Sequence, residues 1–175
     1  MYIRKVKSGK MKSKTGNKLL LFLMFFMAHW FFGNLYEEIV LAPNNLVNTF
    51  EALSHWQSYF TVSNQIYYYV PITMVAIIIF CILYFNTTDK IQKQFLKKAS
   101  IFGLLAIGIS IIIITQINTK LFFGNNLIKY KDQLYTLSVI WLIGNAIRLY
   151  LVASSFYYIF KTYQLNQSQI NNKNN

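Results

Sequence analysis

The sequence predicts an all-α polytopic membrane protein, in which four transmembrane helices form a bundle and an amphipathic helix lies in the first outer loop. Hydrophobic residues make up 55% of the chain and charged residues only 13%, whereas soluble domains carry roughly 25% charged residues. Four apolar runs reach the roughly 18 residues that cross a bilayer, a length that buried helices of soluble proteins do not need. Lys and Arg gather in alternate segments between these runs.

The four apolar runs give the spans in order along the chain. The first covers residues 19–42 and ends before Pro43; it is too long for a signal peptide and lacks a small-residue cleavage site. The other three cover residues 67–85, 99–117 and 134–160, and each has the length of a bilayer span.

The spans divide the chain into three parts. Residues 1–18 form a basic N-terminal segment, and residues 19–161 form the transmembrane domain. Residues 162–175 form a polar tail of low complexity, which we expect to be disordered because it contains few residues that could be buried.

Apolar residues recur at three- and four-residue spacing in the first outer loop, which predicts a helix lying in the membrane interface. They are Leu46, Phe50, Leu53, Trp56 and Phe60. Such a helix can simply cover the end of the bundle, which we favour, or it can act as a lid over a ligand pocket.

The positive charges follow the order of the spans. They lie mainly before the first span, between the second and third, and after the fourth. The positive-inside rule therefore predicts a multi-pass protein of the cell membrane with both termini in the cytoplasm. Although the net charge of +12 could suit nucleic acid, this placement predicts contacts with anionic membrane lipids and no nucleic-acid partner.

The residues that usually hold metals or cofactors are scarce. Cys81 is the single cysteine and lies within an apolar run. His55 lies in the first outer loop, so His29 has no partner for a metal or a second axial position on haem. The sequence also lacks a Gly-rich phosphate loop, a serine nucleophile elbow, HExxH and CxxC. We therefore expect no metal and no cofactor.

Polar residues within the fourth span lie on one narrow stripe, because their spacing follows steps of three, four and seven. They are Ser138, Trp141, Asn145, Arg148 and Ser155. Since polar groups in hydrocarbon are costly, this stripe should face the other helices, and its residues are candidates for function.

The first span carries a second polar face. His29, Gly33 and Glu37 are spaced by four residues, and Asn34 and Glu38 lie one position further round. Gly33 would let another helix approach closely. We therefore expect the two polar faces to meet in a pocket in the outer half of the bundle. The deep tier of this pocket comprises His29, Asn145 and Arg148, and the tier nearer its mouth comprises Glu37, Asn118 and Trp141.

Two of these residues have alternative interpretations. Arg148 needs a counter-charge, which Glu37 or Glu38 can supply, and that pair could serve only to fix the register of the helices. His29 could be an interhelical hydrogen-bond donor, or a general base, because imidazole exchanges protons near neutral pH.

Three short motifs resemble the anthrone oxygenase-like family, a group of small four-helix membrane proteins that mostly have no assigned function. They are GNLYEEIVLAP from Gly33 to Pro43, Ile117-Asn118 with Leu121, and WLIGNAIR from Trp141 to Arg148. The resemblance implies a cofactor-independent oxidoreductase that converts an anthrone into an anthraquinone with dioxygen.

On this resemblance, His29 would be the base, Asn118 and Asn145 would hold the carbonyl group, and Arg148 would stabilise the enolate oxygen. The resulting hypothesis is a membrane pocket that binds or oxidises a lipophilic aromatic or quinone-like molecule. The alternative is a non-catalytic structural, assembly or small transport subunit, similar to the DoxX-like proteins, whose polar stripe only holds the helices together. A cavity lined by the polar residues would favour the first hypothesis.

Overall fold

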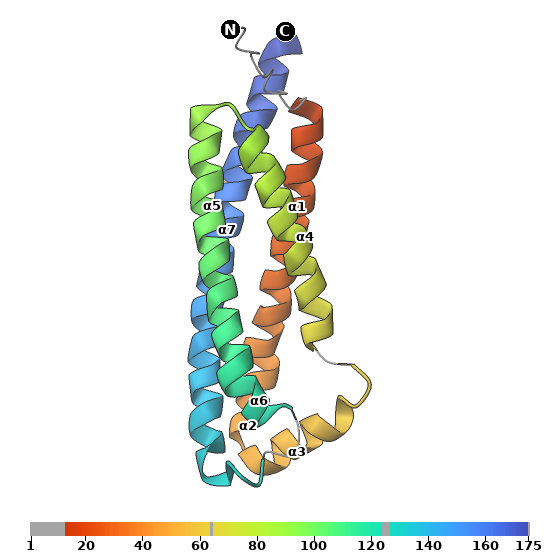
Figure 1. Ribbon diagram of the computed structural model, residues 1–175, viewed down its shortest axis with the longest axis vertical. Helices are drawn as coiled ribbons and strands as arrows, with labels where there is room; N and C mark the ends of the chain where they lie inside the picture. The colour runs from red at the N-terminus through yellow and green to blue at the C-terminus, as the bar shows by residue number, and fades with distance from the viewer. Residues whose placement is uncertain (1–12, 64, 124–126, 175) are drawn as a thin grey trace, which may run out of the picture.

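The computed structural model describes residues 13–63, 65–123 and 127–174, and these residues form helices and connecting turns without a strand (Figure 1). The long helices are α1 (Ser13–Tyr36), α4 (Gln65–Asn86), α5 (Lys90–Ile112) and α7 (Leu134–Asn174), and the shorter elements are η1 (Glu37–Leu41), α2 (Ala42–Leu46), α3 (Thr49–Tyr59), η2 (Ile113–Asn118), α6 (Thr119–Leu121) and η3 (Lys131–Gln133). Most of the predicted basic segment at 1–18 lies outside the described residues.

Four helical stretches are long and apolar enough to cross a membrane. They cover Thr15–Leu46, Gln65–Asn86, Lys90–Leu121 and Lys131–Asn171. Large apolar side chains such as Phe25, Ile78 and Leu104 are exposed on the outside of the bundle, as lipid-facing residues would be. The four predicted spans therefore correspond to four long helices, each of which extends beyond the apolar run itself.

The α1 helix begins and α7 ends at the same end of the bundle, as an even number of spans requires (Figure 1). We call this the α4–α5 end, because the turn between those helices lies there, and we call the opposite end the α3 end. The α7 helix packs against both α1 and α5, whereas α4 packs mainly on α1 and only lightly on α5. In Figure 1, α4 leans away from α5 toward the α3 end.

Two apolar cores hold the bundle together. Near the α4–α5 end, Leu23, Ala99 and Val152 are completely buried between α1, α5 and α7. At the α3 end, Leu53 and Leu121 are completely buried in a second cluster. Without a hydrophobic effect between helices in lipid, such close packing is what stabilises a membrane bundle.

The segment in which the amphipathic helix was predicted contains the helix α3, although Leu46 lies in the preceding α2 and Phe60 follows the end of α3. Leu53 is buried, and Gln57 Nε2 donates a hydrogen bond of 3.0 Å to the carbonyl oxygen of Leu121. Trp56 packs against Phe122, with ring centroids 5.4 Å apart. This helix therefore covers the α3 end of the bundle.

The tail that was expected to be disordered is helical, because α7 continues to Asn174. Asn166 is buried and donates a hydrogen bond of 2.6 Å to Asn17 on α1. Gln169 accepts a hydrogen bond from Gln92 and donates another to Asp89. The sequence prediction was wrong because it treated amides as solvated groups, whereas here they pair with polar residues of neighbouring helices.

Two of the four long apolar stretches contain a wide π-helical turn near the α3 end. The first, η1, begins at Glu37, and the second, η2, ends at Asn118. Pro43 follows η1 as the second residue of α2; it lacks an N–H group and cannot make the regular α-helical hydrogen bond to the carbonyl of Ile39. Wide turns of this kind change the rotation of the residues beyond them and are frequent at functional sites.

Candidate functional site

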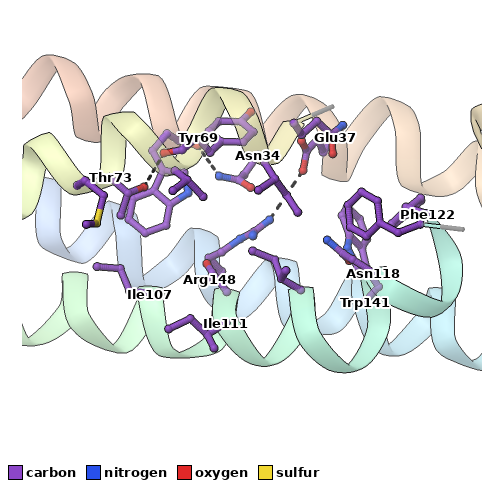
Figure 2. Close-up of a pocket in the computed structure, with 18 of the residues that line it drawn as sticks. Asn34, Glu37, Tyr69, Thr73, Ile107, Ile111, Asn118, Phe122, Trp141 and Arg148 are labelled. Atoms are coloured by element: carbon purple, nitrogen blue, oxygen red, sulfur yellow. Dashed lines mark hydrogen bonds and ion pairs between the residues drawn. The ribbon is translucent and has the colours of Figure 1, made fainter. Parts of the chain in front are cut away.

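A cavity of about 330 Å³ lies inside the bundle near the α3 end. Its walls come from α1, α3, α4, α5 with η2, and α7 (Figure 2). Its polar lining residues include Asn34, Glu37, Tyr69, Thr73, Asn118, Trp141 and Arg148, and most of the remaining wall is aliphatic or aromatic. A largely apolar cavity with a few convergent polar groups is typical of small-molecule sites.

An ion pair crosses this cavity wall between α7 and η1. Arg148 Nη2 lies 3.8 Å from Glu37 Oε2, and the two side chains are only 10% and 7% exposed (Figure 2). It is the one ion pair found among the described residues. Because each charge has a partner, the cavity presents polar groups to a ligand without an uncompensated charge.

Asn145 contacts Arg148 on the side away from the cavity lining and is completely buried. The Arg148 guanidinium donates to Asn145 Oδ1 from both Nε and Nη2. Asn145 Nδ2 donates to Glu38 Oε2 at 2.7 Å and to the carbonyl oxygen of Asn34 at 3.2 Å. One amide therefore links α7 to α1 and η1 and fixes the orientation of the guanidinium.

Two polar atoms in the cavity have no hydrogen-bond partner among the residues that the structure describes. Trp141 Nε1 and Asn118 Oδ1 are both buried, and both residues line the cavity. A buried donor or acceptor without a partner costs about 1–3 kcal/mol. A ligand that offers one acceptor and one donor would remove that cost at both atoms.

Gly33 of α1 has no side chain, and the Tyr69 side chain of α4 occupies the space that a Cβ atom would fill. A Cβ atom at this position would overlap the hydroxyl of Tyr69 and approach its Cζ to 2.9 Å. Gly33 therefore allows close packing, as predicted, but the group that it admits is a side chain rather than a backbone. Gly33 itself does not line the cavity; Tyr69 does.

The structure places His29 outside this cavity. Its ring stacks on Phe25 and meets the edge of Tyr68, with centroids 6.2 Å and 4.9 Å away. The predicted meeting of His29 with Arg148 in one pocket is therefore not found. The reason is helical phase: residues spaced by four drift by about 40° at each step, so His29 and Glu37 point about 80° apart.

The predicted site residues thus fall into three groups. Glu37, Asn118, Trp141 and Arg148 line the cavity together. Asn145 and Glu38 support Arg148 from outside the lining, while Gly33 and His29 face α4.

The sequence did not single out Tyr69 and Thr73 as site residues. Tyr69 lies in a run of three tyrosines that resembles an interfacial belt, and Thr73 bonds the backbone of its own helix through a 2.9 Å contact with the Tyr69 carbonyl. No signal in the sequence separates such residues from packing residues. Asn34 appeared on the polar face of α1, but its place in the lining is a result of the rotation of that helix.

Among the described residues, no group of three His, Cys, Asp or Glu side chains is placed to hold a metal ion. No protein-family model, no curated protein and no solved structure matches the chain. The case for a function therefore depends on the cavity itself.

Proposed function

We propose that this protein binds a lipophilic small molecule with a neutral, planar polar head, of the phenol, hydroquinone or quinone type, in the cavity beside Glu37 and Arg148. The observation that carries the proposal is a mainly apolar cavity of about 330 Å³ with an unpaired donor, Trp141 Nε1, and an unpaired acceptor, Asn118 Oδ1. A carbonyl oxygen suits the first atom, and a hydroxyl group suits the second.

The remaining lining supports a planar and uncharged ligand. Trp30, Trp56, Trp141 and Phe122 contribute flat aromatic surface to the walls, and offset or edge contacts between rings are favourable. Because Glu37 already compensates the charge of Arg148, a charged head would leave one charge unbalanced in a buried place.

Oxidation of such a molecule is the catalytic form of this proposal. Among the described lining residues, Glu37 carries the one carboxylate, and we assign to it the role of base that the sequence gave to His29. Proton removal from an activated ring carbon gives a carbanion whose enolate oxygen would accept hydrogen bonds from Arg148. Dioxygen then adds to that carbon, and loss of water from the resulting peroxide leaves a ketone.

Tryptophan fluorescence offers a direct test, because all three tryptophans of the chain line the cavity. Menadione, a small naphthoquinone, should quench the fluorescence of the purified protein in detergent micelles with a saturable dependence on concentration. The Arg148→Ala and Trp141→Phe variants, which remove hydrogen-bond donors from the cavity wall, should bind more weakly. Gly108→Ala is the matched control, because nothing lies within 4 Å of that position.

The alternative of a purely structural bundle makes the opposite prediction. In that case quenching would rise linearly with the quinone dissolved in the micelle and would be equal in all variants. Consumption of dioxygen with an anthrone as substrate then separates binding from catalysis: Glu37→Gln should abolish turnover while it retains menadione binding.

A further inference from the structure

A second cavity of about 270 Å³ lies between α4 and α5, nearer the α4–α5 end of the bundle. Its walls are almost entirely apolar and include Ala76, Phe80 and Leu104. Lys97 and Tyr84 also line it, and the ammonium group of Lys93 lies 4.9 Å from the centre of the Tyr84 ring. The cavity therefore combines an apolar interior with positive charge close to its edge.

We propose that this cavity is a specific binding site for an anionic phospholipid, with one acyl chain between α4 and α5 and the phosphate at Lys97 and Lys93. This site adjoins the proposed ligand cavity, but the proposal does not depend on the ligand proposed there.

The charges at the site fit an anionic head. Lys97 is exposed, and no carboxylate pairs with it among the described residues. The nearest acid in sequence, Asp89, is engaged in capping α5 through Gln92 N and in accepting a hydrogen bond from Gln169. Anionic lipid surfaces attract basic residues placed at the ends of transmembrane helices.

The length of the cavity fits one acyl chain. On α5 the lining extends from Lys97 to Ile107, a separation of ten residues that corresponds to about 15 Å at the helical rise. The hydrocarbon core of a bilayer is about 30 Å thick, so one leaflet has about this depth. The chain would end at Trp30, Thr73, Ile77 and Ile107, which line both cavities.

The weak packing of α4 on α5 provides the entry from the bilayer. Met27 and Gly103 form part of the floor, and the exposed Ile101 lies on the lining near the lipid side. A chain from the surrounding leaflet can therefore enter sideways while its head stays at the membrane surface.

Neighbouring lysines on α5 give a matched test. Lys97 lines the cavity, whereas the ammonium group of Lys98 lies over Tyr158 of α7, 5.4 Å from the ring centre. Native mass spectrometry of the full chain in detergent, with phosphatidylglycerol and phosphatidylcholine of identical chains, should show one retained phosphatidylglycerol. Lys97→Gln should reduce its preference over phosphatidylcholine about five-fold, whereas Lys98→Gln should leave it unchanged.

A second measurement reports on the acyl chain without altering the fold. Cys81 is the single cysteine and lines this cavity, so phosphatidylglycerol should slow its alkylation by N-ethylmaleimide, while inorganic phosphate should not. Equal retention of both lipids, equal effects of the two lysine substitutions, or protection of Cys81 by inorganic phosphate alone would each overturn the proposal.

Discussion

Asn145 accepts hydrogen bonds from the Arg148 guanidinium at the same time as its own amide nitrogen donates to Glu38 over 2.7 Å. The two residues are one helical turn apart on α7 and are both buried. Asn145 is therefore a positioning residue: it sets the direction in which Arg148 reaches Glu37 and the cavity, although it does not line the cavity itself.

Replacement of this amide should destabilise the bundle. Asn145→Ala leaves the buried Arg148 without its hydrogen-bond acceptor, and a buried group left in this way costs about 1–3 kcal/mol. The partly exposed Glu38 also loses its donor. We expect the free energy of unfolding, measured by titration with sodium dodecyl sulfate in mixed micelles, to fall by at least about 2 kcal/mol. The matched control is Asn118→Ala, whose Oδ1 accepts no hydrogen bond and whose loss should change stability little. Equal effects of the two substitutions would contradict the positioning role.

Removal of one charge of the Glu37–Arg148 ion pair should reduce the stability of the protein more than removal of both charges together. Arg148→Met leaves Glu37 buried and unpaired, and such single removals cost about 3–5 kcal/mol. The double variant Glu37→Gln with Arg148→Met removes both charges, so it should recover most of that stability in the same unfolding assay. Binding of menadione should stay weak in both variants. Full recovery of binding in the double variant would show that the pair only fixes the helices.

The contact between Gly33 and Tyr69 should control one wall of the ligand cavity. Gly33→Ala would push the Tyr69 ring from its place. We therefore expect the dissociation constant for menadione to rise about ten-fold, which corresponds to a loss of about 1.4 kcal/mol of binding free energy. Gly108→Ala, on an open surface, should have no effect. In a Tyr69→Ala background the Gly33→Ala substitution should have no further effect; a persistent loss there would mean that Gly33 acts by another route.

His29 should be dispensable for the ligand cavity, because its ring faces Phe25 and Tyr68. His29→Phe keeps an aromatic ring in that place, and both the quenching by menadione and any turnover of an anthrone should remain within about two-fold of the natural protein, a difference of less than about 0.5 kcal/mol. If turnover is lost while the helical content is unchanged, the base is His29 and the assignment of Glu37 is wrong.

The predicted orientation can be checked with single cysteines in a Cys81→Ser background. Ser58 on α3 and Lys90 at the start of α5 are both exposed and lie toward opposite ends of the bundle. With both termini in the cytoplasm, a membrane-impermeant maleimide added to intact cells should label Ser58→Cys and leave Lys90→Cys unlabelled until the membrane is opened. The reverse pattern would invert the topology.

Much of the candidate site follows from the periodicity of the sequence. The stripe on the fourth span was predicted at Trp141, Asn145 and Arg148, and these residues do face the bundle interior, because polar groups in an apolar span are stable only where they find partners. A pairing of Arg148 with Glu37 or Glu38 was predicted for the same reason, and the structure shows that Arg148 pairs with Glu37. Helical spacing also placed α3, whose apolar face covers the bundle.

The misplacement of His29 has its cause in rotation about the helix axis. His29 and Glu37 were predicted to lie on one face because they are separated by a multiple of four residues. The face of the helix that lines the cavity instead carries Trp30 and Glu37, which are seven residues apart. The wide turn that begins at Glu37 shifts the rotation of the residues beyond it, and no pattern in the sequence marks such a turn before Pro43 is considered.

By itself, the sequence determined that four helices are apolar enough for a membrane and which of their residues are too polar to face lipid, because the cost of exposing a polar group depends on the residue alone. Only the tertiary structure decided which neighbour each polar face meets: Glu37 and Arg148 at a cavity, His29 against Tyr68, and the amides of Asn17 and Asn166 against each other. That choice depends on the rotation and tilt of whole helices, which the packing of distant side chains sets.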